Sequence, residues 1–174
     1  MIPSLERGPV YSLSNDGNAG QILCDGWYGN EPNGTWSVAQ GGRIIANLGS
    51  FRGEAPSLVK IHVKCRVKAP SDGSKVTVNI VSSGDFLAKW EFHDEAFTEQ
   101  VVLYNVEPED DMALIDLSLV RLDHEAEHTE PAGIDIRPLG IFVQSIQILD
   151  VDLASDDMPD SPAVLNEDVL AEQE

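Results

Sequence analysis

Apolar and polar residues alternate with a period of two through the middle of the chain. The clearest run covers residues 59–67, where every second residue is apolar and the residues between them are polar. Because successive side chains of a β-strand point to opposite faces, the run predicts a strand with one buried and one outward face. The buried set is Val59, Ile61, Val63, Cys65 and Val67, and the outward set is Lys60, His62, Lys64 and Arg66.

Further short runs continue this rhythm, separated by loops rich in Asp, Glu, Pro and Gly. Residues 76–80 repeat the alternation after a turn at 70–73, so we expect them to form a hairpin with residues 59–67. The remaining strands are predicted at 86–92, 98–104, 113–120 and 139–151.

The last predicted strand does not keep one parity. Ile141 and Val143 fit one face, whereas Ile146 and Ile148 fit that face only if one extra residue intervenes. We therefore expect a β-bulge near residues 144–145.

Short strands without a long helical pattern favour an all-β fold, an antiparallel β-sandwich. The chain has 174 residues, of which 42% are hydrophobic, and this suits one domain with one core. We divide it into an N-terminal segment at 1–19, a β-sandwich domain at 20–151 and an acidic tail at 152–174. The tail contains eight acidic residues and no lysine or arginine, a composition typical of a flexible segment.

Thirty acidic residues against eleven basic ones give a formal net charge of −19. Such a charge repels phosphate backbones and anionic headgroups, so we expect no nucleic-acid partner. No apolar run approaches the roughly 20 residues of a membrane-spanning helix, so membrane insertion is not expected. The N-terminus lacks the basic and apolar regions of an export signal, which favours a cytoplasmic location.

The chain has two cysteines, Cys24 and Cys65. Neither belongs to a CxxC pair or to a Cys/His pattern typical of metal sites. In a reducing compartment we expect both to be free, buried, small apolar residues. A disulfide would require their two strands to be neighbours.

Two segments break the alternation seen elsewhere. The first, residues 26–37, interleaves aromatic rings with Gly, Asn and Pro, which is typical of an irregular loop that holds large rings in place. The second, residues 131–143, sets a charged pair just before an apolar strand. The residues concerned are Trp27, Tyr28 and Trp36 in the first segment, and Asp135 and Arg137 in the second.

Together these segments resemble a β-sandwich domain that is attached to bacterial glycosyltransferases and other proteins of polysaccharide synthesis. The resemblance spans about residues 20–150 and implies a galactose-binding-like jelly roll, the fold of many carbohydrate-binding modules. The residues that carry it are Gly26, Trp27, Glu31, Gly34, Trp36, Ser37, Gly41 and Leu48 early in the chain, and Pro131, Gly133, Asp135, Arg137, Leu139, Gly140, Ile141, Ile146 and Ile148 late in it.

A carbohydrate ligand would stack its C–H faces on aromatic rings, while carboxylate, amide and guanidinium groups would bond its hydroxyls. Structural roles stay open for the same side chains, because a tryptophan buries roughly 150–250 Å² and favours the core. An ion pair of Arg137 with Glu31 would likewise hold the two segments together. The candidate ligand-binding residues are Trp27, Tyr28, Glu31, Trp36, Asp135 and Arg137.

The patterns for metal and catalytic sites are weaker. His124 and His128 have metal-ligand spacing for a helix, but their polar neighbours indicate a loop. The turn at 15–18 would suit a structural calcium or an ordinary turn. Glu31 and Asp135 are the best carboxylate pair for a glycosidase, and no nucleophile elbow, phosphate loop or zinc motif is present. We therefore expect no enzyme, no metal site and no cofactor.

The sequence thus predicts a non-catalytic carbohydrate-binding module in bacterial surface-polysaccharide synthesis or recognition. The alternative is a protein-interaction or scaffold subunit of a polysaccharide synthase or glycosyltransferase complex. The basic outward row would suit an acidic polysaccharide or an acidic protein segment. A concave face lined by those side chains would favour the first function, whereas a flat apolar patch or a symmetric dimer would favour the second.

Overall fold

The structure of the protein is a computed structural model that describes residues 5–70, 72–108, 114–121 and 139–151. The predictions that lie outside the described residues are those on His124, His128, Asp135, Arg137 and the tail at 152–174.

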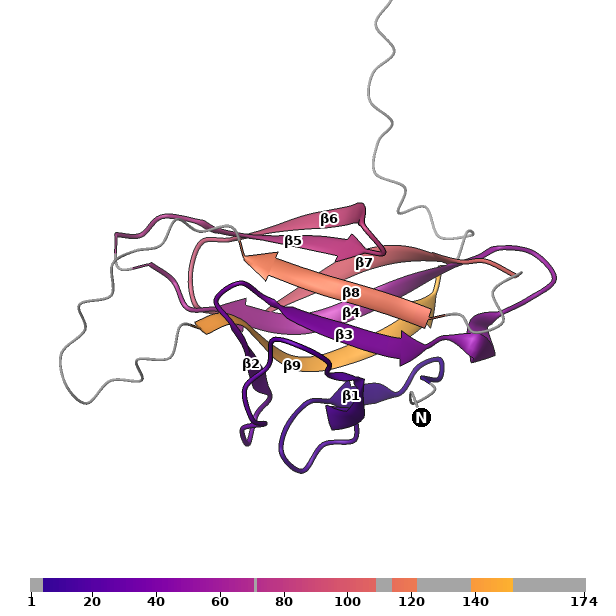
Figure 1. Ribbon diagram of the computed structural model, residues 1–174, viewed down its shortest axis with the longest axis horizontal. Helices are drawn as coiled ribbons and strands as arrows, with labels where there is room; N and C mark the ends of the chain where they lie inside the picture. Colours follow the sequence, from indigo (N-terminus) through magenta and orange to yellow (C-terminus); the bar gives the residue numbers. More distant parts are fainter. Residues whose placement is uncertain (1–4, 71, 109–113, 122–138, 152–174) are drawn as a thin grey trace, which may run out of the picture.

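The described part of the chain consists of β-strands and two short 3-10 turns, drawn in Figure 1. None of its helices is long and apolar enough to cross a membrane. The strands are β1 (Val10–Ser12), β2 (Thr35–Val38), β3 (Gly42–Asn47), β4 (Ser57–Val67), β5 (Val76–Ser82), β6 (Asp85–Phe92), β7 (Thr98–Val106), β8 (Leu114–Arg121) and β9 (Leu139–Asp150), and the turns are η1 (Gly20–Ile22) and η2 (Gly49–Phe51).

The strands form two antiparallel sheets that face each other across one core (Figure 1). In the five-stranded sheet, β9 lies between β4 and the two short strands β1 and β2, and β7 lies outside β4. The other sheet has the order β3-β8-β5-β6. The pairs β2/β9, β3/β8, β4/β7 and β5/β6 are nested along the chain, which is the connectivity of a jelly roll. The predicted all-β antiparallel sandwich is confirmed.

The N-terminal segment contributes to this sandwich. Strand β1 lies within residues 1–19 and pairs with β9 from Val10 opposite Gln147 to Ser12 opposite Ser145. Part of that segment therefore belongs to the five-stranded sheet.

Strand β4 has the two faces that its alternation predicts. Val59, Ile61, Val63, Cys65 and Val67 each expose 1% or less of their surface and lie in the core. Full burial of a valine or isoleucine side chain contributes roughly 1.5–3 kcal/mol, so this face anchors the sheet. The polar residues between them lie on the outer face of the sandwich, as predicted.

The predicted hairpin between the runs at 59–67 and 76–80 is wrong. Strand β4 pairs with β7 and β9, whereas β5 pairs with β6 and β8 in the opposite sheet. The alternation identifies the buried face of a strand but not its neighbours. Both runs bury one face, and the chain between them passes from one sheet to the other, so that these faces meet in the core.

The predicted bulge near residues 144–145 is confirmed. Lys64 pairs with Ser145 and the next residue of β4, Cys65, pairs with Val143, so Gln144 is an extra residue in β9. The bulge lets apolar residues on both sides of it, Val143 and Ile146, point into the core.

Both cysteines are free thiols, as predicted, but only Cys65 is buried. Cys24 is exposed, which corrects the expectation that both are buried. Its neighbour Leu23 packs against the core and bridges to Ile44 of β3. In an extended segment the next side chain points the opposite way, so Cys24 faces outward.

Candidate functional site

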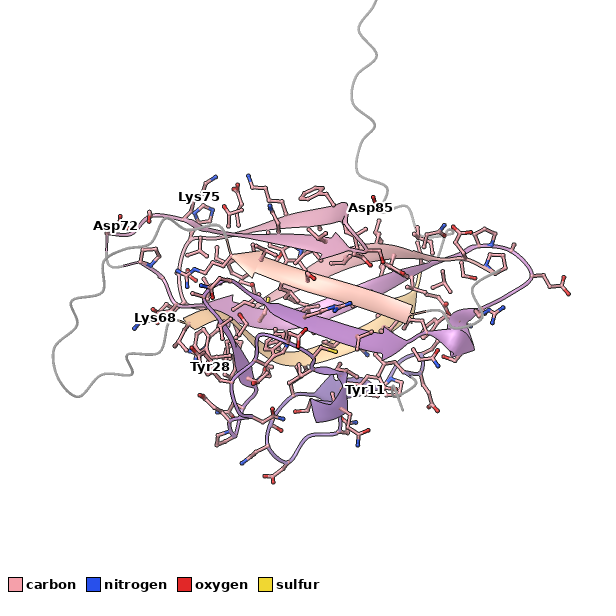
Figure 2. All side chains as sticks on the ribbon, viewed as in Figure 1. Tyr11, Tyr28, Lys68, Asp72, Lys75 and Asp85 are labelled. Atoms are coloured by element: carbon pink, nitrogen blue, oxygen red, sulfur yellow. The ribbon has the colours of Figure 1, made fainter. Side chains whose placement is uncertain are left out.

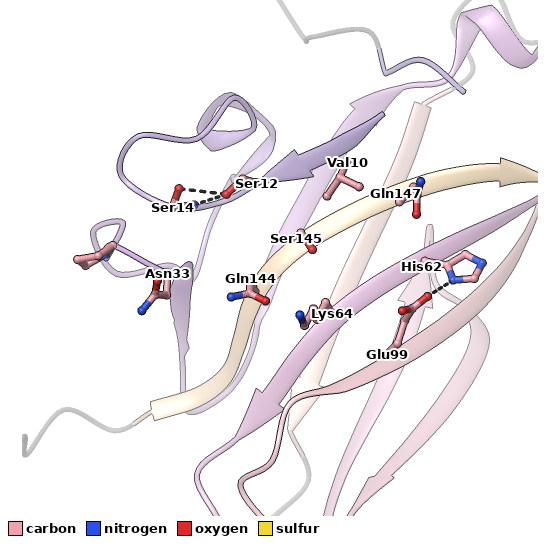
Figure 3. Close-up of a pocket in the computed structure, with 11 residues that line it drawn as sticks. Val10, Ser12, Ser14, Asn33, His62, Lys64, Glu99, Gln144, Ser145 and Gln147 are labelled. Atoms are coloured by element: carbon pink, nitrogen blue, oxygen red, sulfur yellow. Dashed lines mark hydrogen bonds and ion pairs between the residues drawn. The ribbon is translucent and has the colours of Figure 1, made fainter. Parts of the chain in front are cut away.

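The outer face of the five-stranded sheet is hollowed beside β9. The hollow has a volume of about 470 Å³ and is open to solvent. Figure 3 shows that side chains from β1, β9, β4 and β7 surround it. The lining residues are Val10, Ser12, Ser14, Pro32, Asn33, His62, Lys64, Glu99, Gln144, Ser145 and Gln147.

Strand parity places most of these side chains. His62 and Lys64 are outward residues of β4, and Glu99 is the cross-strand partner of Lys64 on β7. The bulge in β9 adds a further polar group, because Gln144 and Ser145 both line the hollow although they are adjacent in sequence.

Two loops close the side of the hollow next to β1. The Ser12 Oγ and Ser14 Oγ atoms are 3.0 Å apart and share a hydrogen bond. The Asn15 N–H donates to the Glu31 carbonyl at 2.9 Å, which ties this loop to the turn that carries Asn33. These contacts place Ser14 and Asn33 on the same rim (Figure 3).

The turn at 15–18 has a structural task. The Asn18 Oδ1 atom accepts a hydrogen bond from the Ser12 N–H at 2.9 Å, and the Gly17 N–H donates to the Ser14 carbonyl at 2.9 Å. No group of three or more potential metal ligands occurs among the residues that the structure describes. The described contacts of this turn are those of an ordinary turn.

A histidine–glutamate contact lies at the β7 side of the hollow. The His62 Nδ1 and Glu99 Oε1 atoms are 2.5 Å apart. The His62 Nε2 atom is buried and has no hydrogen-bond partner in the described part of the chain. The contact directs the Glu99 carboxylate toward His62 and away from its cross-strand neighbour Lys64.

A cluster of aromatic rings surrounds Arg66 further along the same face. The Arg66 Cζ atom lies 4.9 Å from the centre of the Phe97 ring, 5.0 Å from that of Phe142 and 5.6 Å from that of Trp36. Trp36 and Phe142 meet edge to face, with ring centres 5.0 Å apart. The Lys64 Nζ atom lies 6.0 Å from the Phe97 ring, so this Arg66 cluster adjoins the hollow.

Trp36 is the predicted aromatic residue that lies on this face. It exposes 8% of its surface, because β2 pairs with β9 and sets Trp36 opposite Phe142. Its ring contacts the Arg66 guanidinium and is largely covered, so it offers little surface to a ligand. Trp36 therefore takes part in the site through Arg66.

Trp27 does not line the hollow. Its indole N–H donates to the Arg43 carbonyl at 2.8 Å, and a Cβ atom at Gly42 would come within 2.4 Å of its ring. The ring thus fills the space over β3 and packs against the core.

Tyr28 and Glu31 hold the loop in shape through their backbones. The Tyr28 N–H donates to the Trp36 carbonyl at 2.9 Å, and Figure 2 shows Tyr28 on the β2 side of the sandwich. The Glu31 N–H donates to the Gly34 carbonyl at 2.7 Å and closes a tight turn. The tip of this turn, residues 32–33, reaches the hollow.

The remaining predicted site residues, Asp135 and Arg137, lie outside the described residues. The structure therefore brings Trp36 and the turn at 31–34 to the outer face and leaves Trp27 on β3. The outward row of β4 signalled His62 and Lys64 in the sequence. The broken parity of the last strand signalled a bulge at Gln144, but no sequence pattern signalled Ser12, Glu99 or Gln147, which meet through strand pairing alone.

Neither a scan against protein-family models nor a search of curated proteins finds a match to this chain. Among solved structures, it is similar to a family 6 carbohydrate-binding module, with 10% identity and a TM-score of 0.41 over 82% of this chain and 94% of that one. It is also similar to a Podospora anserina GH26-CBM35 β-(1,4)-mannanase, with 12% identity and a TM-score of 0.42 over 91% of this chain and 29% of that one. A third similar structure contains the CBM22-1-GH10 modules of Clostridium thermocellum xylanase 10B, complexed with xylohexaose. It shares 12% identity and a TM-score of 0.41 over 90% of this chain and 26% of that one.

Proposed function

We propose that the chain is a non-catalytic carbohydrate-binding domain whose site is the hollow on the outer face of the five-stranded sheet. The observation that carries the proposal is the lining of this hollow, in which polar side chains from four strands and two loops converge. Its volume of about 470 Å³ falls within the usual size of ligand sites.

The lining matches the hydrogen-bonding needs of sugar hydroxyls. A hydroxyl both donates and accepts, and so do the amides of Asn33 and Gln144 and the hydroxyl of Ser145. These three side chains have no hydrogen-bond partner among the described residues and are available to a ligand. Gln147 already uses one amide N–H, which donates to the Gly8 carbonyl at 2.5 Å, so its second N–H and its carbonyl oxygen remain for a ligand.

An apolar surface stands beside these polar groups. The Phe97 ring is 39% exposed and lies next to Lys64, at the end of the hollow nearest the Arg66 cluster. Aromatic rings give sugar C–H faces an apolar surface without competing for the hydroxyls. We propose that a glycan lies along β4 and β9, from the loop rim toward Phe97.

The biological setting is a separate part of the proposal. The resemblance of the two sequence segments supports a role in bacterial surface-polysaccharide synthesis or recognition. A cytoplasmic location stays a prediction from the N-terminal sequence.

Isothermal titration calorimetry of the full chain against neutral and acidic bacterial polysaccharides and their oligosaccharides tests this function. We expect saturable binding that Gln144→Ala weakens about 2- to 10-fold, since a lost hydrogen bond costs roughly 0.5–1.5 kcal/mol. The matched control is Gln40→Ala, which changes an exposed glutamine outside the hollow and should leave affinity unchanged.

Two results would contradict the proposal. The first is the absence of binding heat across the panel while the protein stays folded. The second is an equal effect of the Gln144 and Gln40 variants, which would place binding outside the hollow.

A second function, a protein-interaction or scaffold subunit of a polysaccharide synthase or glycosyltransferase complex, is favoured by one observation. Strand β7 is an edge strand of the five-stranded sheet, and its outward residues Val101 and Leu103 are 41% and 52% exposed. An exposed edge with apolar side chains suits the addition of a partner strand. Leu103→Glu should then abolish co-purification with the synthase subunits and leave glycan binding intact.

A further inference from the structure

Positive charge gathers on the outer face of the five-stranded sheet, although the chain carries a formal charge of −19. On the outward positions of β4, β7 and β9, all of which the structure describes, Lys60, Lys64 and Arg66 are the cations. Glu99 is the carboxylate on these positions. The face is therefore locally positive while the molecule as a whole is strongly negative.

These cations are left without acidic partners. Within the described residues, no carboxylate lies within ion-pair distance of Lys60, Lys64 or Arg66. The lysines on the other sheet differ, since Lys75 and Lys89 hold Glu91 at 2.8 and 3.1 Å.

Lys64 has a carboxylate directly across the strand pair, that of Glu99, but forms no ion pair with it. Glu99 lies directly opposite Lys64 in the β4/β7 register, yet its carboxylate contacts His62 at 2.5 Å. The Lys64 ammonium therefore points into the hollow with its charge unpaired (Figure 3).

Arg66 is held in place without an acid. Three aromatic rings lie within 5.6 Å of its guanidinium carbon, and its Nε atom is buried without a hydrogen-bond partner in the described residues. Rings attract a guanidinium but do not neutralise it. Because Arg66 is two residues from Lys64 on one face of β4, the two side chains leave the strand about 7 Å apart.

We propose that the glycan of the hollow is an acidic polysaccharide whose uronate carboxylates pair with Lys64 and then with Arg66. This inference rests on the proposed carbohydrate-binding function and names the ligand class of that same site. An anionic sugar suits the position better than an acidic peptide, because Lys64 is surrounded by the amides and hydroxyls that bond ring hydroxyls. The amides are those of Asn33 and Gln144.

The test compares uronate oligosaccharides, of galacturonic, mannuronic and guluronic acid, with their methyl esters, which keep the ring hydroxyls and remove the charge. Calorimetry on the full chain should show at least one acid binding about 10- to 100-fold more tightly than its ester, the range expected for a charged hydrogen bond. The preference should shrink as NaCl is raised from 0.05 to about 0.5 M.

Lys64→Gln should remove most of this preference, because loss of the ammonium lowers affinity for the acid far more than affinity for the ester. Lys64 is exposed and has no ion partner among the described residues, so its loss should not lower the melting temperature. The matched control is Lys89→Gln on β6, which removes one positive charge from the opposite sheet and should keep the preference.

Equal affinity for acids and esters would overturn the acidic-ligand inference and leave the carbohydrate-binding function standing. Absence of binding to every glycan, acidic or neutral, would overturn both. A poly-glutamate peptide that binds as tightly as the best acid would also overturn the inference and show a surface for acidic protein segments.

Discussion

Trp27 and Trp36 belong to one glycine-rich segment and have different surroundings. The Trp27 indole is anchored to the Arg43 carbonyl over β3, whereas Trp36 lies under Arg66 on the outer face. A strand reverses side-chain direction at each residue, and the turn at 31–34 reverses the chain itself. The sequence segment therefore divides its rings between two sides of the sandwich.

Replacement of Trp27 by phenylalanine tests its structural role. Trp27→Phe keeps an apolar ring over Gly42 but removes one of the two hydrogen bonds that the Arg43 carbonyl accepts, since the Cys24 N–H still donates to it at 2.9 Å. The free energy of unfolding should therefore fall by about 1 kcal/mol. Urea denaturation measures this change. An unchanged stability together with a lost glycan affinity would instead make Trp27 a ligand-binding residue.

Because the Cys65 thiol is buried, the free energy of unfolding should depend on pH in the alkaline range. Burial raises the pKa of its thiol from 9.0 to about 12. The unfolded thiol ionises above about pH 9 and the folded thiol does not, so this contribution is complete below pH 9 and is lost as pH rises to about 12.

The loss from this one group is at most about 1.4 kcal/mol per pH unit. The free energy of unfolding, measured by denaturation at several pH values between 8 and 11, should therefore fall less steeply with pH for Cys65→Ala than for the natural chain. Parallel curves for the two proteins would show that the Cys65 thiol ionises as easily folded as unfolded.

At the scale of elements, the bulge in β9 gives the site its shape. The bulge accommodates the extra residue Gln144 without changing the inward parity of Ile146, and Gln144 adds a second polar side chain to the rim of the hollow. Bulges bend a strand and increase its twist. The bulge thus keeps the core residues in place while it adds a polar group to the outer face.

Deletion of Gln144 tests whether the bulge is needed for the hollow and not for the core. Without it, residues 141–148 alternate regularly, with the valine and the isoleucines inside and with Phe142, Ser145 and Gln147 outside. The deletion variant should therefore stay folded, with a melting temperature within a few degrees of the natural chain. Its glycan affinity should fall, because the amide and the local curvature are both lost.

Circular dichroism melting and calorimetry on one preparation measure the two effects. Unfolding of the deletion variant would show that the bulge is needed for folding, for example through the Leu13 N–H that donates to the Gln144 carbonyl at 3.0 Å.

At the scale of the whole molecule, the net charge opposes the approach of an acidic glycan and the local charge attracts it. The potential of exposed charges is screened within about 10 Å at 0.1 M salt. At moderate salt the cations of β4 therefore dominate near the hollow, and at low salt the acidic remainder of the chain contributes more.

Removal of residues 152–174 tests this balance. The truncation deletes eight acidic residues and leaves a formal charge of −11, so affinity for an acidic oligosaccharide should rise at 0.05 M NaCl and stay unchanged at about 0.5 M. The melting temperature should stay nearly the same, because the sequence predicts a tail there. A large fall in melting temperature would show that these residues belong to the folded body.

The sequence by itself determined strands β4 to β9, the buried face of β4 and the bulge. Strands β1, β2 and β3 were not predicted, and β2 begins inside the segment expected to be an irregular loop. The predicted features depend on the order of apolar and polar residues within one strand, as in Val59 to Val67, and a period of two leaves little choice about which face is buried. The basic outward row of β4 was visible for the same reason.

Only the tertiary structure decided which strands are neighbours. In it, β5 and β4 belong to different sheets, and Glu99 lies opposite Lys64 but contacts His62. The rings around Arg66 are those of Phe97, Phe142 and Trp36. Pairing between distant strands is fixed by how two whole sheets cover one core, and no local pattern records it. The hollow, which is built from four strands and two loops, exists only once that packing is complete.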